Sequence, residues 1–244
     1  MLTPQGFITA FKKGRMNFEG VTVDGNIDIH AEIRVVGCLN LSRMTVKGYL
    51  DLSLVTVEDH FCKGDGSLNL NNTTVNGHLD LNSVRVGSHL DLRGMTINGY
   101  LHLNYVTVRG NLNLSHMMVK GYLNLNEMVV EGNLNLSGTT VESYFSISNM
   151  MTGGHLDLSD IMVECYTNLD SVVIRGNLLF NNATVGGIEL NNATVNGNIY
   201  CGGNQALALR CHMAFPQTSV HFDYKEIERS KELAKELDRL LRSV

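Results

Sequence analysis

The stretch GHLDLNSVRVG-SHLDLRGMTIN-GYLHLNYVTVR, residues 77–109, repeats one pattern every eleven residues. Each unit opens on glycine or on a residue in its place, and apolar residues follow two, four, seven and nine positions later. The frame continues through GNLNLSHMMVK (110–120) and GYLNLNEMVVE (121–131). A short fixed period of this kind indicates a repeat architecture.

The spacing inside each unit predicts strands rather than helices. Apolar residues two positions apart place their side chains on one face of a strand. No apolar stripe with a period of 3.6 residues runs through the unit, which argues against a helical solenoid. Because each unit buries only one side, its core must come from stacking on neighbouring units. The sequence therefore predicts a β-solenoid.

The residue directly after each glycine indicates how many residues make one coil. These residues alternate between two sets from one repeat to the next: one set is mainly aromatic and the other polar. The first set is His78, Tyr100, Tyr122, Tyr144 and Tyr166, and the second is His89, Asn111, Asn133, His155 and Asn177. A coil of eleven residues would stack all ten in one column. We therefore expect a coil of about 22 residues, two repeats with four faces, in which stacked aromatic and stacked Asn columns favour parallel in-register pairing.

Written in fives, these repeats resemble a known family. Leu79-Asp-Leu-Asn-Ser, Val84-Arg-Val-Gly-Ser, Leu90-Asp-Leu-Arg-Gly and Met95-Thr-Ile-Asn-Gly look like pentapeptide repeats over roughly residues 20–203. That resemblance implies a right-handed quadrilateral β-helix. The family uses Ala or Cys where this chain often has Leu, Val or Met, and it lacks the regular extra residue. A weaker resemblance is to bactofilins, β-helical cytoskeletal polymers rich in Gly-x-Leu and Gly-x-Val.

The predicted fold is an all-β parallel β-helix of four-faced coils with an added C-terminal amphipathic α-helix. We expect an N-terminal cap over residues 1–19, the repeat domain over 20–203, an irregular capping segment over 204–222 and the helix over 223–244. In the cap, Phe7, Ile8 and Phe11 fit one or two helical turns. Lys12, Lys13 and Arg15 leave a basic contact to a membrane or partner as the alternative role.

The C-terminal helix is predicted from its start signal and its apolar stripe. Asp223 with Glu226 three residues later resembles a capping box. The stripe has helical spacing and consists of Ile227, Leu233, Leu237, Leu240, Leu241 and Val244. We expect this face to cover the last coil, and a homodimer contact through it is a further expectation.

Composition limits the compartment. No run of eighteen apolar residues exists, so no membrane span is predicted, and the N-terminus lacks the apolar core of a signal peptide. The odd number of cysteines, five, shows no paired spacing and indicates a reducing compartment. We expect a cytoplasmic protein of bacterial type, or one delivered into a host cytosol.

No motif predicts catalysis, a metal or a cofactor. The frame breaks at residues 59–66, where about half a repeat is missing or bulged. There His60, Cys62 and Asp65 suggest a metal site, but they lack paired ligand spacing, so a tolerated loop is the favoured interpretation. No serine lies in a nucleophile elbow. The chain is therefore expected not to be an enzyme, and an enzyme site hidden in this loop is the least favoured hypothesis.

Charge gives one hint about the surface. Residues 122–173 contain no Lys or Arg. Their acidic residues form the candidate interaction surface: Glu127, Glu131, Glu142, Asp157, Asp160, Glu164 and Asp170. Some pentapeptide-repeat proteins resemble duplex DNA and protect gyrase, so the resemblance implies a topoisomerase-protecting DNA mimic as one alternative. Solubility alone also explains an acidic face. Binding to nucleic acid is not expected, because no basic stripe with aromatic residues is present.

The function expected from the sequence is a rigid β-solenoid surface for protein–protein interaction, as an inhibitor, mimic or effector. The second hypothesis is a scaffold that polymerises end to end, as bactofilins do. A polymer needs open solenoid ends, whereas this chain is expected to cover its last coil.

Overall fold

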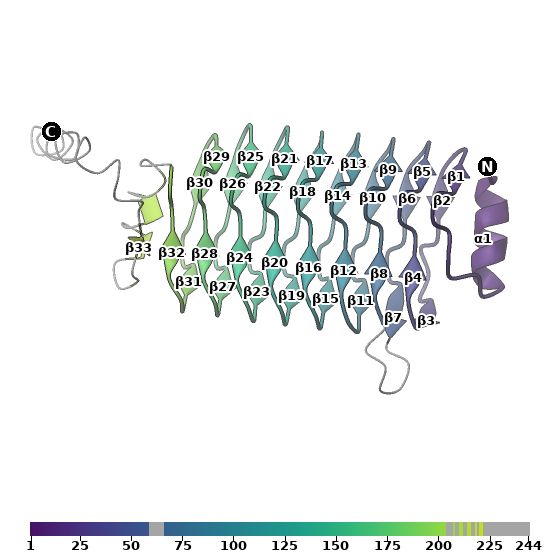
Figure 1. Cartoon of the computed structure of the whole chain (residues 1–244), viewed down its shortest axis with the longest axis horizontal. Helices are drawn as coiled ribbons and strands as arrows, with labels where there is room; N and C mark the ends of the chain where they lie inside the picture. Colours follow the sequence, from purple (N-terminus) through teal and green to yellow (C-terminus); the bar gives the residue numbers. More distant parts are fainter. Residues whose placement is uncertain are drawn as a thin grey trace, which may run out of the picture.

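The structure is a computed structural model that describes residues 1–58 and 66–203, together with residues 207, 210, 211, 214, 215, 218, 220 and 221. Helix α1 (Pro4–Lys12) precedes a four-sided tube of parallel β-sheets (Figure 1). The all-β solenoid predicted from the eleven-residue period is confirmed.

Each side of the tube is one sheet, numbered here in the order in which the chain first meets it. The first sheet consists of β1 (Thr22–Val23), β5 (Thr45–Val46), β9 (Thr74–Val75), β13 (Thr96–Ile97), β17 (Met118–Val119), β21 (Thr140–Val141), β25 (Met162–Val163) and β29 (Thr184–Val185). The second consists of β2 (Ile27–Asp28), β6 (Leu50–Asp51), β10 (Leu79–Asp80), β14 (Leu101–His102), β18 (Leu123–Asn124), β22 (Phe145–Ser146), β26 (Thr167–Asn168) and β30 (Ile188–Glu189).

The remaining two sheets complete the coil. The third consists of β3 (Arg34–Val36), β7 (Thr56–Glu58), β11 (Arg85–Val86), β15 (Thr107–Val108), β19 (Val129–Val130), β23 (Met151–Thr152), β27 (Val173–Ile174) and β31 (Thr194–Val195). The fourth consists of β4 (Leu39–Asn40), β8 (Leu68–Asn69), β12 (Leu90–Asp91), β16 (Leu112–Asn113), β20 (Leu134–Asn135), β24 (Leu156–Asp157), β28 (Leu178–Leu179), β32 (Ile199–Tyr200) and β33 (Val220–His221).

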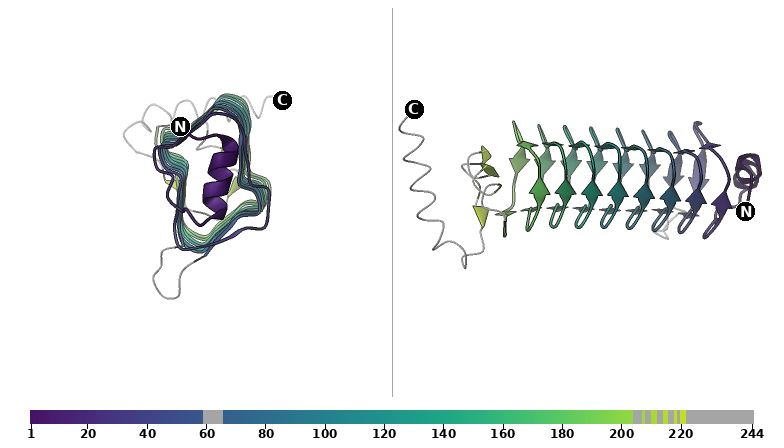
Figure 2. Two further views of the ribbon diagram at one scale, coloured as in Figure 1. Left: turned by 90° about the vertical axis from the view of Figure 1, so that its right-hand side faces the viewer. Right: turned by 90° about the horizontal axis from the view of Figure 1, so that it is seen from above.

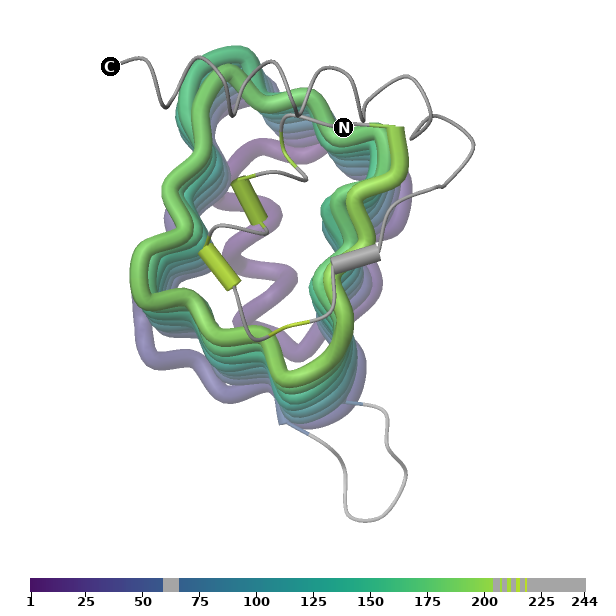
Figure 3. The backbone as a smooth tube through the Cα atoms, turned by 90° about the vertical axis from the view of Figure 1, so that its left-hand side faces the viewer, coloured from purple at the N-terminus to yellow at the C-terminus, as the bar shows by residue number. Residues whose placement is uncertain are grey.

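The register between strands fixes the length of one coil. Leu79 pairs with Leu101, and Thr96 pairs with Met118, so paired residues are 22 positions apart. An eleven-residue coil would pair β10 with β12, whereas β10 pairs with β6 and β14. The predicted four-faced coil of two repeats is confirmed, and Figure 3 shows the coils superposed end on.

Departures from this coil length are confined to the corners. Leu39 pairs with Leu68, 29 positions away, because residues 59–65 add seven residues to one coil between β7 and β8. The interruption of the frame at residues 59–66 is thus an insertion, and no half repeat is missing from the stacked strands. Thr167 pairs with Ile188, only 21 positions away, which matches the single residue dropped at Gly186-Gly187-Ile188.

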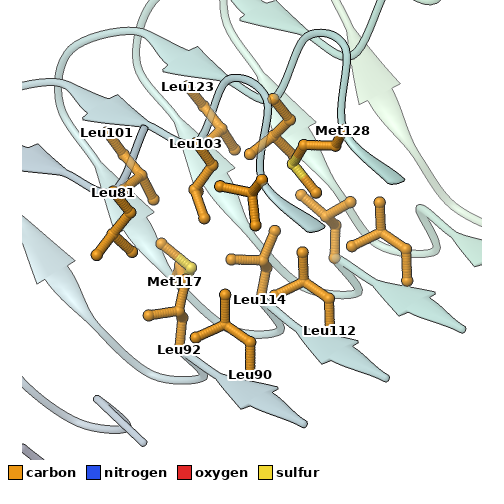
Figure 4. Close-up of a cluster of buried hydrophobic side chains, with 14 of the residues drawn as sticks. Leu81, Leu90, Leu92, Leu101, Leu103, Leu112, Leu114, Met117, Leu123 and Met128 are labelled. Carbon is orange, nitrogen blue, oxygen red and sulfur yellow. The ribbon is translucent and has the colours of Figure 1, made fainter. Parts of the chain in front are cut away.

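The core is a continuous apolar column inside the tube. The residues two, four, seven and nine positions after each glycine point inward, as Figure 4 shows for Leu101, Leu103 and their neighbours. Leu112 and Leu114 are both fully buried, while Asn113 between them is half-buried on the outer face. A strand of two residues carries little stability of its own, so the stacked core must hold the coils together.

Where a repeat has an outward Asp or Asn, as at Asp80, that side chain builds the corner that follows. Asp80 Oδ1 accepts a hydrogen bond of 2.8 Å from the backbone N–H of Asn82, an Asx turn. The next residue, Ser83, has a positive φ of 58°, and Val84 N–H then donates to Leu81 O at 3.2 Å. The Asp or Asn of the five-residue pattern is therefore a turn-forming residue, which its chemistry alone explains.

Helix α1 lies across the first coil and covers the N-terminal end of the tube (Figure 2). Thr3 caps the helix by accepting a hydrogen bond from Gly6 N–H, and Pro4 occupies the first turn. Phe7 and Phe11 are buried, and the Phe7 ring lies 4.3 Å from that of Phe18. This helix obstructs end-to-end stacking through the first coil.

At the other end, the chain returns to the tube after the last full coil. Strand β33 pairs in parallel with β32, and Leu207 and Phe215 between them are buried. The predicted helix over 223–244 lies outside the described residues. Its capping and dimer roles remain predictions for Ile227, Leu233, Leu237, Leu240, Leu241 and Val244.

Two buried threonines in this core differ in how their hydroxyls are paired. Thr167 Oγ1 is buried and has no hydrogen-bond partner among the described residues, whereas Thr139 Oγ1 donates to Leu114 O at 2.6 Å. Leaving a buried polar group unpaired costs about 1–3 kcal/mol. Thr167→Val should therefore raise the free energy of unfolding by about 1 kcal/mol, as measured by urea denaturation.

The matched variant Thr139→Val should lower the free energy of unfolding by about 1 kcal/mol, because it leaves Leu114 O without its donor. Equal effects of the two substitutions would contradict the assignment of Thr167 as the unpaired group.

Candidate interaction surface

Two opposite corners of the tube carry the two columns that alternate in the sequence. We call the corner between the first and second sheets the aromatic corner, and that between the third and fourth sheets the polar corner. In both, the residue after each glycine extends along the tube axis over the next coil.

The polar corner is explained by backbone hydrogen bonding. Asn111 Oδ1 accepts from Asn133 N–H at 2.9 Å, and Asn133 Oδ1 accepts from His155 N–H at 2.7 Å. His155 continues the chain, since its Nδ1 accepts from Asn177 N–H at 2.8 Å. Each side chain thus accepts a hydrogen bond from a corner N–H that lies outside the strand ladders, so His155 has a structural role here.

At the aromatic corner His78 Nδ1 also accepts from Tyr100 N–H, at 2.9 Å, but from Tyr100 onward the column is held by stacking. The rings of His78 and Tyr100 lie 4.2 Å apart and within 3° of parallel, and those of Tyr100 and Tyr122 lie 4.9 Å apart at 10°. The predicted column of tyrosines from successive coils is therefore present. Between Tyr122 and Tyr144 the spacing grows to 6.0 Å and the rings tilt by 50°.

The tilt occurs where serine replaces glycine. A Cβ at Gly121 would lie 2.5 Å from Tyr100 Cδ1 and 2.8 Å from Gly99 O, so a flat stack requires glycine there. Ser143 occupies the equivalent place in the next coil. Its Cβ accounts for the displacement of the Tyr122 ring that it faces.

The aromatic corner also exposes unusually large apolar side chains. Tyr122 and Tyr144 are 45% and 53% exposed, and Met118 and Met162 on the adjoining first sheet are 43% and 50% exposed. Glu142 and Glu164 occupy the positions between these methionine and tyrosine columns. We define the ladder edge as Tyr100, Tyr122, Tyr144, Met118, Met162, Glu142 and Glu164. Figure 1 shows the turns that carry it, from β13, β17, β21 and β25 to β14, β18, β22 and β26.

The seven acidic residues singled out in the sequence do not share one face. Glu142 and Glu164 lie in one column at the aromatic corner, one coil apart, and Asp157 lies on the fourth sheet. The other four occupy three more corners: Glu131 at the polar corner, Asp160 between the fourth and first sheets, and Glu127 and Asp170 between the second and third. These seven carboxylates form no continuous row.

Four of them, Glu127, Asp157, Asp160 and Asp170, accept local hydrogen bonds. Glu127 Oε1 accepts from the Tyr105 hydroxyl at 3.0 Å, which raises the pKa of Tyr105. Asp170 Oδ1 accepts from Asn191 N–H at 2.8 Å in the next coil. The sequence predicted one common acidic surface. In the structure, the close neighbours among the seven residues are Glu142 and Glu164.

A groove of about 290 Å³ lies on the third sheet and was not anticipated from the sequence. Its charged lining is Glu58, Arg85 and Arg109. Glu58 pairs with Arg34, whose Nε lies 2.7 Å from Glu58 Oε2. Within the described part of the chain, Arg85 and Arg109 form no ion pair. The separation of Arg85 and Arg109 in the sequence is close to the length of one coil, so the sequence could have predicted that they lie on adjacent coils.

One cluster brings serine, histidine and aspartate together. Ser53 Oγ donates to Asp51 Oδ1 at 2.6 Å and also contacts His30 Nδ1 at 2.6 Å. Serine lies between the other two and is 3% exposed, whereas a catalytic triad needs histidine between serine and aspartate. This arrangement satisfies polar groups at a corner and does not resemble a nucleophile site.

Neither a metal site nor a membrane-spanning helix occurs within the described ranges. Over residues 1–58, 66–203 and the described positions beyond, no three His, Cys, Asp or Glu side chains gather as a metal site. In that same part of the chain, no helix has the length and apolarity to cross a bilayer. His60, Cys62 and Asp65 lie outside the described residues.

Tyr166 offers a test of the local electrostatics. Its hydrogen bond to Glu189, with burial and the charges of Glu189 and Asp170, raises its pKa to about 12, while Arg210 opposes the shift. A raised pKa means that Tyr166 contributes stability below its unfolded pKa of about 10 and loses that contribution as pH rises through about 12.

An alkaline titration followed by phenolate absorbance should show this late-ionising tyrosine. Tyr166→Phe should remove its transition, and Glu189→Gln should move it towards about pH 10. An unchanged titration in Glu189→Gln would contradict the role of this carboxylate.

Comparison with known proteins adds little to this geometry. No family model and no curated protein matches the chain. Among solved structures, it is similar to HetL, a pentapeptide repeat protein involved in heterocyst differentiation regulation from the cyanobacterium Nostoc sp. strain PCC 7120, with 12% identity. The match covers 79% of this chain and 94% of HetL, with a TM-score of 0.24, so it carries no argument about function. The chain's own four sheets and two-repeat coils establish a pentapeptide-repeat-like β-helix.

Proposed function

We propose that this chain is a non-enzymatic scaffold that binds a protein partner along the ladder edge. The observation that carries the proposal is the contrast between the two corners. Asn and His at the polar corner are needed to accept corner N–H groups. Tyrosine has no acceptor at that position and holds the corner by stacking alone, which leaves the Tyr122 and Tyr144 side chains about half exposed.

The chemistry of the ladder edge is that of a binding surface. Tyrosine and methionine are enriched at protein interfaces, and tyrosine is among the residues that contribute most binding energy. Each exposed tyrosine combines an apolar ring with a hydroxyl that can donate a hydrogen bond. Met118 and Met162 add flexible apolar area beside these rings.

The charge of the same surface points to the chemistry of the partner. Glu142 and Glu164 lie beside the tyrosines, and the whole chain has a net charge of −5. A partner with apolar side chains flanked by lysine or arginine would match both features. A second copy of this chain fits less well, because its own ladder edge would bring like charges together.

The scaffold is suited to such binding because the surface is ordered beforehand. Backbone hydrogen bonds of 2.9 Å from Leu101 N–H to Tyr122 O and from Leu123 N–H to Tyr144 O fix the tyrosine spacing. A surface that is already ordered loses less conformational entropy on binding.

Photo-crosslinking in the source cell would identify the partner. A benzoylphenylalanine at Met162, on the ladder edge, should crosslink one protein strongly. The same group at Met151, which is similarly exposed on the third sheet, should not. Equal crosslinking at both positions would count against a dedicated surface.

Binding of the purified partner would then test the residues. Replacing Tyr122 and Tyr144 by Ser should weaken binding by roughly thirty-fold or more, the effect of losing a hot spot worth about 2 kcal/mol. Glu142→Lys with Glu164→Lys should weaken binding and reduce its salt dependence. The matched variant Val129→Ser with Met151→Ser should bind as the original chain does. Unchanged affinity of the Tyr122/Tyr144 variant would refute the proposal.

A further inference from the structure

One inward column of the core ends in a cysteine. The buried residues Leu136, Leu158 and Phe180 follow one another on successive coils, and the next position in this column is Cys201. Phe180 N–H donates to Tyr200 O at 2.7 Å, which fixes this register. Cys201 is 2% exposed, so its thiol points into the last coil, where a larger apolar residue stands in the coils before.

A second cysteine reaches the same place from the segment beyond the last coil. Cys211 is fully buried, and its carbonyl accepts a hydrogen bond from Phe215 N–H at 2.9 Å. Its thiol hydrogen-bonds to the sulfur of Cys201. This bond lowers the pKa of Cys201, against the effect of burial, while the bond and burial together raise the pKa of Cys211.

The two thiols belong to different parts of the chain, the last coil and the segment beyond it. After Cys201 the chain leaves the last coil, and it returns to it at β33, which pairs with β32. Leu207 and Phe215 are buried in the same region. A bond between the two sulfurs would therefore tie the segment beyond β32 to the end of the apolar core.

We propose that Cys201 and Cys211 are an oxidisable thiol pair whose disulfide locks the C-terminal end of the solenoid. The arrangement has the geometry of such a pair: the two sulfurs are in contact, so that one can be oxidised first and the other can resolve that oxidation product. Cys38 and Cys165 differ, because both are exposed and neither lies at this end of the tube.

The oxidant is a peroxide. The Cys201 thiolate attacks one peroxide oxygen, the O–O bond breaks, and hydroxide leaves, so that Cys201 becomes a sulfenic acid. The Cys211 thiol then attacks the Cys201 sulfur, forms the S–S bond and releases the sulfenic oxygen as water. Two electrons pass from the two thiols to the peroxide. A dithiol reductant reverses the step, which suits the reducing compartment indicated by the cysteine count.

Thiol counting and peptide mapping of the full chain test the pair directly. Hydrogen peroxide should reduce the free thiols from five to three, with the new disulfide mapped between Cys201 and Cys211. The variant Cys38→Ser/Cys62→Ser/Cys165→Ser should go from two thiols to none. Dithiothreitol should restore the original count in both. Mapping of the disulfide to any other pair, or recovery of sulfinic acid at Cys201 instead, would overturn the proposal.

The locking effect is measured separately in the same triple variant. Oxidation should raise its melting temperature by roughly 5 °C, because a disulfide restricts the unfolded chain. Adding Cys211→Ala to the triple variant should abolish the shift. If that variant does not fold, comparing the reduced and oxidised forms of the triple variant still tests the lock. Equal melting temperatures would show that the disulfide does not stabilise the C-terminal end of the solenoid.

Discussion

The backbone hydrogen bonds between successive coils are the constraint on which the rest of this structure depends. Each strand has only two or three residues, so nearly all of its pairing energy comes from the coils above and below. Pairing in register from coil to coil requires every coil to present the same outline. The strand pairs accordingly stay in register on both sides of the inserted stretch of sequence after Glu58 and of the shortened turn at Gly186. The inward positions are apolar with few exceptions, because the stacked core holds these short strands together.

The corners of the tube, and not its sheets, indicate where a partner would bind. At the polar corner, side chains of Asn111, Asn133 and His155 supply acceptors that the backbone needs, so their chemistry is explained by the fold. At the aromatic corner, the tyrosines stack but remain about half exposed, beside two exposed methionines and two carboxylates. A rigid solenoid can display such a surface without any loop to order it. The proposed partner contact therefore follows from a difference between two corners that the repeat makes otherwise equivalent.

The fold could be predicted from the sequence because the residue pattern within one repeat also indicates how that repeat stacks on its neighbours. The alternation of Tyr100 and Asn111 was enough to choose two repeats per coil over one. The same spacing was not applied to the acidic residues, where it would have placed Glu131 and Glu142 at different corners instead of on one surface. The contact between Cys201 and Cys211 could not be foreseen, because residue 211 lies outside the frame and its position depends on how the chain folds back. The tilt at Tyr122 was also hidden, since it depends on the Cβ of Ser143 one coil away.

The rise per coil distinguishes a solenoid of two-repeat coils most directly, and spin-label distances measure it. Nitroxide labels would replace outward residues of the first sheet in a chain whose native cysteines are changed to Ser. Thr45 is four coils from Thr140 and six from Thr184. At about 4.8 Å per coil, double electron–electron resonance should give narrow distributions whose means differ by roughly 10 Å between these two pairs. A difference near twice that value, expected for coils of one repeat each, or broad overlapping distributions would contradict the rigid solenoid of two-repeat coils.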